Sequence, residues 1–226
     1  MTADPHLAGK ILTAGPPPEK ANYAAILLHG RGAPAAGMLA LGEQLALPDI
    51  AFLAPEAAHN TWWPHSFLAP LPQNEPHITS AIATVHRAVT ELGAAGVAPS
   101  RILLAGFSQG ACLAIEYAAR HPAKFLGVVA MSGGLIGTAD NPLAYPDEAL
   151  HKHREKHFGY EGRLDDVHVS LSVCEKDPHI PLKRVHDTSA ILTAMGARVE
   201  TYTQPGIGHS IFQHDIRMLR HILNDG

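Results

Sequence analysis

Short apolar runs alternate along the chain with longer segments in which apolar residues recur every three or four positions. The short runs are apolar on consecutive positions, which is typical of strands covered on both faces; they lie at Tyr23–Leu28, Ile50–Ala54, Arg101–Gly106, Leu126–Ser132, Val167–Cys174 and Ala197–Thr203, after a shorter strand at Lys10–Ala14. The longer segments predict helices at Ala35–Leu47, Pro76–Gly93, Gln109–His121, Leu182–Met195 and His209–Leu223. This alternation predicts an α/β fold with a mostly parallel central sheet and helices on both faces.

Residues 133–166 interrupt the alternation. They contain no predicted strand, and they carry two prolines and a charged stretch for which a short surface helix is expected at Asp147–His157. Irregular insertions of this size usually serve as lids or covers. The chain of 226 residues has the length of one large domain. We therefore expect a single domain over residues 1–226, with a lid or covering excursion at 133–166.

Composition and charge exclude several classes of protein. Lys and Arg number 17 against 21 Asp and Glu, a net charge of −4, so no basic surface for nucleic acid is indicated. The N-terminus has no signal-peptide pattern, and the longest apolar stretch, Phe125–Gly137, falls short of a membrane span. Cys112 and Cys174 lie in apolar segments and cannot make a disulfide framework. We expect a cytoplasmic protein without membrane insertion, and the oligomeric state stays open, a homodimer included.

The strongest local signal is the sequence Gly106-Phe107-Ser108-Gln109-Gly110, a G-x-S-x-G motif. A predicted strand precedes it and a predicted helix follows it, which is the setting of a nucleophile elbow. In so tight a turn, side chains on both flanking positions would collide, so glycine is needed there. Ser108 then stands exposed at a helix N-terminus as a candidate nucleophile.

A serine nucleophile needs a base and a group that orients the base. His209 lies in the glycine-containing segment Gly206-Ile207-Gly208-His209, after the last predicted strand. Asp177 follows the strand before it, and Glu175 is its nearest competitor. In an open α/β sheet such loops gather at the carboxyl ends of the strands. Ser108, His209 and Asp177 are therefore the candidate catalytic residues.

Two backbone donors are needed for the oxyanion that forms during acyl transfer. One is the N–H of Gln109, the residue after the nucleophile. The other should come from an early strand-to-helix loop, and Leu28-His29-Gly30-Arg31-Gly32 supplies a glycine-rich loop directly after the first long strand.

Together these motifs resemble the phospholipase/carboxylesterase family of α/β-hydrolases, which includes bacterial carboxylesterases and acyl-protein thioesterases. The resemblance spans nearly the whole chain, from about Tyr23 to the last predicted helix. It implies esterase or thioesterase activity without a cofactor, and it implies the backbone N–H of Arg31 as the second oxyanion donor. The sequence departs from the family pattern at Arg31, where a small or apolar residue is common.

Two further features invite a functional interpretation. Trp62 and Trp63 lie on a loop at the same edge of the predicted sheet, and at least one of them is expected to line a substrate pocket. The chain has 16 histidines, and His151, His153 and His157 resemble a metal cluster. Their spacing matches no zinc motif, so we interpret them as a solvated helix face and expect no metal.

The sequence thus predicts a serine hydrolase that cleaves small carboxylic esters or thioesters through an acyl-enzyme intermediate. A dienelactone-type or carbon–carbon-bond hydrolase and a non-catalytic ligand-binding module on the same scaffold are the alternatives. The side chain of Arg31 has two interpretations: it binds an acidic group of the substrate, or it clamps its loop by pairing with Glu56, an acidic residue of 133–166 or backbone carbonyls. The clamp is the preferred interpretation.

Overall fold

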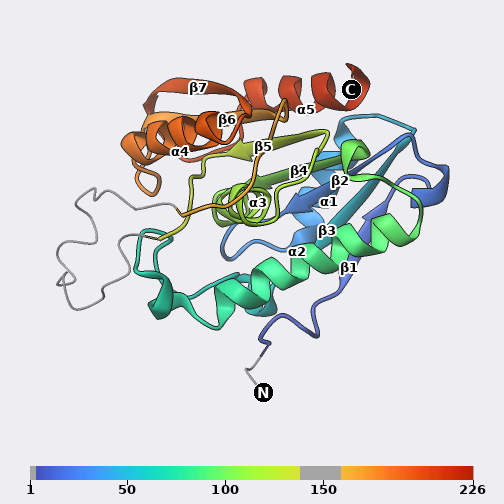
Figure 1. Cartoon of the computed structure of the whole chain (residues 1–226), viewed down its shortest axis with the longest axis horizontal. Coiled ribbons are helices and arrows are strands. Elements are labelled where there is room, and N and C mark those ends of the chain that lie inside the picture. Colours follow the sequence, from blue (N-terminus) through green and yellow to red (C-terminus); the bar gives the residue numbers. More distant parts are fainter. Residues whose placement is uncertain (1–3, 138–158, 226) are drawn as a thin grey trace.

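The computed structural model describes residues 4–137 and 159–225, and these residues form a three-layered α/β domain (Figure 1). Within them lies a seven-stranded sheet of order β1-β3-β2-β4-β5-β6-β7. The strands are β1 (Ile11–Ala14), β2 (Tyr23–Leu28), β3 (Ile50–Pro55), β4 (Ile102–Phe107), β5 (Gly127–Met131), β6 (His168–Lys176) and β7 (Arg198–Ile207). Neighbouring strands are parallel except β1, which pairs antiparallel with β3. The predicted mostly parallel sheet is confirmed.

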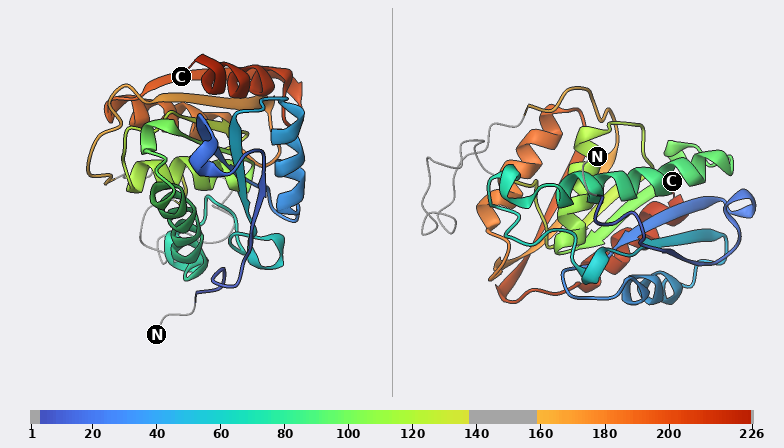
Figure 2. Two further views of the ribbon diagram at one scale, coloured as in Figure 1. Left: turned by 90° about the vertical axis from the view of Figure 1, so that its right-hand side faces the viewer. Right: turned by 90° about the horizontal axis from the view of Figure 1, so that it is seen from below.

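Helices cover both faces of the sheet, as predicted. Successive residues of β2 point to opposite faces, so Ala24 and Ile26 belong to one apolar cluster and Ala25 and Leu27 to the other. The first cluster includes residues of α2 (His77–Ala94), α3 (Gln109–Arg120) and α4 (Leu182–Ala194), and the second includes residues of α1 (Ala35–Gln44) and α5 (Gln213–Asp225). Figure 2 shows α1 and α2 on opposite sides of the sheet.

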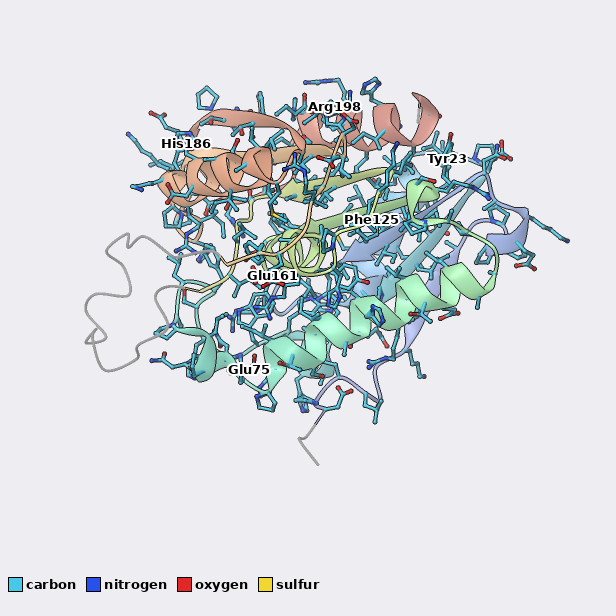
Figure 3. The ribbon with its side chains drawn as sticks, in the orientation of Figure 1. Tyr23, Glu75, Phe125, Glu161, His186 and Arg198 are labelled. Carbon is cyan, nitrogen blue, oxygen red and sulfur yellow. The ribbon has the colours of Figure 1, made fainter. Side chains whose placement is uncertain are left out.

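Side chains fill the space between the layers (Figure 3). Phe125 is buried in the core, whereas Glu161, His186 and Arg198 are exposed. No helix in the described part of the chain is long and apolar enough to cross a membrane.

The last helix begins four residues later than predicted, at Gln213 rather than His209. The reason is a local cap: the backbone N–H of Phe212 donates to Asp215 Oδ2 at 2.7 Å, and the Asp215 N–H donates to the Phe212 carbonyl at 3.0 Å. A carboxylate three residues into a helix that reaches back in this way fixes where the helix starts. His209 therefore lies in the loop between β7 and α5.

The site is assembled at one edge of the sheet. His29, Ser108, Asp177 and His209 follow the carboxyl ends of β2, β4, β6 and β7, respectively. These strands are parallel, so the loops after them meet at the same edge. The predicted lid or cover at 133–166 falls largely on residues 138–158, which lie outside the described residues.

Candidate active site

The turn that carries Ser108 is strained and tightly packed. Ser108 has a φ of 55°, in a region that side-chain-bearing residues rarely adopt. A Cβ atom on Gly106 would lie 2.3 Å from the Gly110 carbonyl, and one on Gly110 would lie 2.2 Å from the Leu28 carbonyl oxygen. The two glycines therefore let the elbow pass close to β2 and place Ser108 at the N-terminus of α3.

His209 connects the other two candidate catalytic side chains. Its Nε2 atom lies 2.8 Å from Ser108 Oγ, and its Nδ1 atom lies 2.8 Å from Asp177 Oδ2. A carboxylate only accepts, so Nδ1 carries the ring proton and Nε2 is free to accept from the Ser108 hydroxyl. The three side chains thus form one chain of hydrogen bonds, in the order that proton transfer from the serine requires.

Asp177 is held in its ionised form by the donors around it. Its side chain is completely buried, and its Oδ1 atom accepts from the backbone N–H groups of His179 at 2.8 Å and Ile180 at 3.0 Å. Burial by itself raises the pKa of this carboxyl, but the hydrogen bonds from His209 and the two backbone donors outweigh it and lower the pKa below its ordinary value. The competitor suggested by the sequence, Glu175, instead accepts from the backbone N–H of Gly206 at 3.4 Å.

The loop after β2 lies directly beside the nucleophile. A Cβ atom on Gly30 would lie 3.4 Å from the Ser108 Cβ, and Gly32 has a φ of 76° that favours glycine. The His29 Nδ1–H donates to the Gly30 carbonyl at 2.9 Å. The Gly30 carbonyl shares a planar peptide with the Arg31 N–H, which points the opposite way. The His29 ring therefore fixes the orientation of the Arg31 N–H, one of the two expected oxyanion donors.

The side chain of Gln109 connects the elbow to residues 56–70, which carry both tryptophans and are here called the tryptophan loop. Its Oε1 atom accepts from the Trp62 N–H at 2.9 Å, and its Nε2 donates to the Trp63 carbonyl at 2.8 Å. Sequence reasoning assigned a role to the backbone of Gln109 and to the loop around His29, but it missed both side chains. Both side chains act through contacts with residues distant in the sequence, which no local pattern indicates.

A cavity of about 820 Å³ opens in front of Ser108 and His209. Its wall carries apolar groups, among them Trp63, Phe67, Phe107 and Ile180. Trp63 thus lies where a pocket-lining residue was expected. Trp62 is not among the residues that line the cavity; its indole is fully buried and stacks on His29 at 5.0 Å between ring centroids.

The side chain of Arg31 lies at this cavity and holds a neighbouring loop. Its guanidinium donates to the Pro64 carbonyl at 2.7 Å and to the His65 carbonyl at 2.5 Å. No ion pair with Glu56 occurs within residues 4–137 and 159–225. The geometry is that of a clamp on backbone carbonyls.

Cys112 and the histidines outside the triad are further candidates for thiol chemistry or metal binding within the described residues. Cys112 is among the residues that line the cavity, but burial raises the pKa of its thiol to about 12, so the thiol stays protonated. Among the described residues no group of three or more His, Cys, Asp or Glu side chains could hold a metal ion. His151, His153 and His157, considered from the sequence, lie outside the described residues.

The sheet order, the elbow and the Ser–His–Asp arrangement define the α/β-hydrolase fold. The chain belongs to the phospholipase/carboxylesterase family, whose model matches residues 13–225. The crystal structure of a phospholipase/carboxylesterase from Dyadobacter fermentans is similar, with a TM-score of 0.84 and 37% identity over 96% of this chain and 97% of that one.

Two curated proteins are also similar in sequence. A probable carboxylesterase of Oryza sativa subsp. japonica is 26% identical over 68% of this chain and 59% of its own length. An acyl-protein thioesterase 1 of Neurospora crassa is 23% identical over 68% of this chain and 57% of its own length. The chain thus spans less than two thirds of the length of these curated relatives.

Proposed function

We propose that this protein is a serine hydrolase that cleaves carboxylic esters or thioesters of small molecules through an acyl-enzyme intermediate. The observation that carries the proposal is the hydrogen-bonded chain from Ser108 through His209 to Asp177, at 2.8 Å for each link, at the edge of a cavity. Membership of a family of carboxylesterases and the similar proteins named above support the same class of reaction.

In the proposed mechanism Ser108 Oγ attacks the acyl carbonyl carbon while His209 Nε2 takes its proton. The carbonyl oxygen becomes an oxyanion and accepts hydrogen bonds from the N–H groups of Gln109 and Arg31. His209 then gives the proton to the leaving alcohol or thiol, and the carbon–oxygen or carbon–sulfur bond breaks. Water, deprotonated by His209, then attacks the carbonyl carbon of the acyl-Ser108 ester. The bond to Ser108 Oγ breaks, His209 returns the proton to Oγ, and the acid leaves. Asp177 stays ionised and stabilises the imidazolium form of His209. No metal or cofactor takes part in these steps.

The test is reaction with a fluorophosphonate probe together with hydrolysis of p-nitrophenyl and thioester substrates of graded chain length. Only an activated serine reacts with the probe, so the wild-type protein should be labelled and Ser108→Ala should not. The loss in kcat should be at least about 10⁴-fold, because triad members act as a unit. An unlabelled, inactive wild-type protein would favour the non-catalytic binding module. A folded Ser108→Ala variant with about a tenth of wild-type activity would exclude the serine mechanism. The cytoplasmic location stays a prediction from the sequence.

A further inference from the structure

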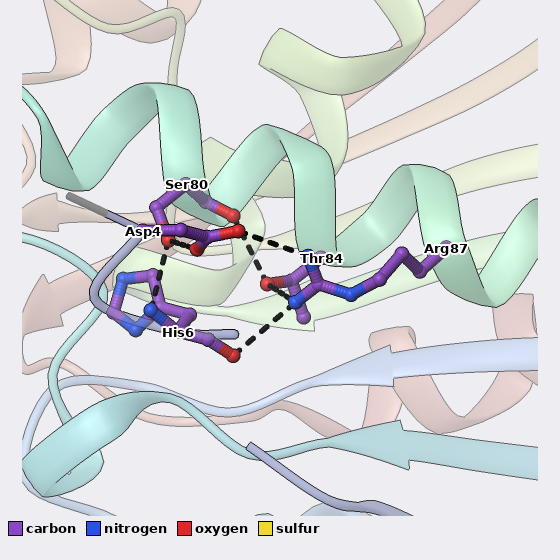
Figure 4. Close-up of polar contacts among 5 residues, drawn as sticks. All are labelled: Asp4, His6, Ser80, Thr84 and Arg87. Carbon is purple, nitrogen blue, oxygen red and sulfur yellow. Dashed lines mark hydrogen bonds and ion pairs between the residues drawn. The ribbon is translucent and has the colours of Figure 1, made fainter. Parts of the chain in front are cut away.

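Residues 4–9, here called the N-terminal strap, cross α2 and are tied to it by several polar contacts (Figure 4). The Asp4 carboxylate accepts from the Ser80 hydroxyl and pairs with Arg87 at 3.4 Å. The backbone N–H of His6 donates to Ser80 Oγ at 2.9 Å, and Arg87 donates to the His6 carbonyl at 3.2 Å. These contacts fix the backbone of the strap where the ring of His6 enters the protein.

The ring of His6 is buried and uses both of its nitrogens. Its Nε2–H donates to the Trp62 carbonyl at 2.8 Å, and its Nδ1 accepts from the Ala58 N–H at 3.0 Å. The ring also meets the Trp62 indole edge-on, with 5.5 Å between centroids. A neutral imidazole offers one donor and one acceptor, so this arrangement satisfies a single tautomer of neutral His6 completely. The strap therefore holds the tryptophan loop at two backbone positions.

Trp62 in turn contacts the loop after β2, which carries His29 and Arg31. Its Nε1–H donates to the His29 carbonyl at 2.9 Å, and its indole stacks on the His29 ring. His29 Nε2 accepts from the Ala57 N–H at 3.1 Å, and His29 Nδ1–H orients the Gly30–Arg31 peptide. A continuous set of hydrogen bonds thus runs from His6 through Trp62 and His29 to the peptide that presents the Arg31 N–H.

We propose that His6 is a positioning residue for the oxyanion hole, acting through Trp62 and His29 from outside the cavity. The inference rests on the proposed hydrolase function. It assigns a role in that function to His6, which is not among the residues that line the cavity. Without the His6 ring, the buried Trp62 carbonyl and the partly buried Ala58 N–H lose their partners, and the loop must shift to find new ones. A shift of about 1 Å at an oxyanion donor can cost about 100-fold in rate.

The test compares kcat and KM of variants under conditions in which each variant is folded to the same extent as the wild type. His6→Ala should lower kcat for a p-nitrophenyl ester by about 10- to 100-fold with KM changed by less than about threefold, because the oxyanion forms only in the transition state. His6→Gln keeps one donor and one acceptor and should recover most of kcat. Leu219→Ala is the matched control, because it lowers the stability of the fold by opening a cavity in the apolar cluster on the other face of the sheet.

A second readout follows the loop itself. The chain has two tryptophans, Trp62 and Trp63, so a ¹⁵N-labelled sample gives two indole N–H signals. In the wild-type protein the Trp62 indole N–H, which donates to the His29 carbonyl, should exchange slowly with solvent. His6→Ala should speed the exchange of this N–H with solvent, while Leu219→Ala and His6→Gln should leave its exchange close to the wild-type rate.

The outcomes separate this inference from the proposed function. If the wild-type protein neither hydrolyses esters nor reacts with the fluorophosphonate, the proposed function fails first. If the wild type is active, an unchanged kcat in folded His6→Ala, or an equal fall in kcat in Leu219→Ala, overturns the positioning role alone. If His6→Ala does not fold, the double variant Ser80→Ala/Arg87→Ala decides, because it removes the side-chain contacts with α2 that hold the strap and, with it, the His6 ring. Its kcat should fall with KM little changed, and full kcat there would overturn the proposal.

Discussion

Replacing Asp177 with asparagine should remove most of the hydrolytic activity and leave the fold in place. The Oδ1 atom of Asp177 accepts two backbone N–H groups, and its Oδ2 atom accepts from His209 Nδ1–H at 2.8 Å. An asparagine keeps an oxygen for the two backbone donors, so its NH2 group replaces Oδ2 and faces His209 as a donor. Because two donors cannot bond, the imidazole must carry its proton on Nε2, where it can no longer accept the proton of Ser108.

The expected loss in kcat for Asp177→Asn is about 10⁴-fold, which corresponds to about 5.4 kcal/mol of activation free energy. The assay is steady-state hydrolysis of p-nitrophenyl acetate, with the melting temperature measured on the same samples. Glu175→Gln is the matched control: this exposed carboxylate lies near the end of β6 and accepts from the backbone N–H of Gly206, and the variant should keep near-wild-type kcat. More than about a tenth of wild-type kcat in folded Asp177→Asn, or a large loss in Glu175→Gln, would refute the assignment of Asp177.

Two further predictions concern stability and the Arg31 clamp. Burial lowers the pKa of His6 and of His29 below 6.5, so the unfolded chain binds more protons than the folded one as the pH falls. The contribution of the two neutral rings to the free energy of unfolding should be complete above about pH 6.5 and decrease below it. Urea unfolding of the wild type and of His6→Gln between pH 8 and 5 should show a shallower decrease in the free energy of unfolding for the variant. Parallel curves would contradict the reasoning. Arg31→Ala removes two hydrogen bonds to the Pro64 and His65 carbonyls. We therefore expect kcat/KM to fall alike for anionic and neutral esters and the melting temperature to drop. A loss of kcat/KM confined to anionic esters, at an unchanged melting temperature, would instead identify Arg31 as a substrate-binding residue.

Local patterns predicted the elements of this fold well and their ends less well. The strand at Tyr23–Leu28 has the predicted bounds, because a consecutive apolar run between polar residues is sufficient for a strand inside the sheet. The strand predicted to end at Thr203 continues to Ile207, where Ile207 pairs with Lys176 of β6 across a register shift. The extension includes Pro205, which an edge strand such as β7 accommodates. Pairing with a neighbour, which local pattern does not contain, sets this end.

The candidate site was predictable where its chemistry is local to a turn. Glycines beside Ser108 and in the loops of Gly30 and His209 are required by close approach or positive φ, and such requirements leave a mark in the sequence. Ser108 and His209 were therefore predicted from their glycine-containing turns, whereas Asp177 was predicted from its position after the strand that lies between them in the sequence. The side-chain bonds of Gln109 to the tryptophan loop span 46 and 47 residues, and no spacing rule relates the two segments.

The abundance of histidine raised the question of metal binding, and two of these residues have a different role in the described structure. His6 and His29 accept from the consecutive backbone N–H groups of Ala58 and Ala57, and each donates to a carbonyl with its other nitrogen. A neutral imidazole is a flat aromatic ring with one donor and one acceptor, so it can bridge two backbone segments while it packs against the Trp62 indole, edge-on at His6 and stacked at His29. Asparagine has the same hydrogen-bonding capacity but no ring to stack, and phenylalanine has the ring but leaves both backbone groups unpaired. Histidine has both an aromatic ring that packs against the tryptophan and a donor and an acceptor that pair with the two backbone groups. This accounts for its presence at these two positions without a metal.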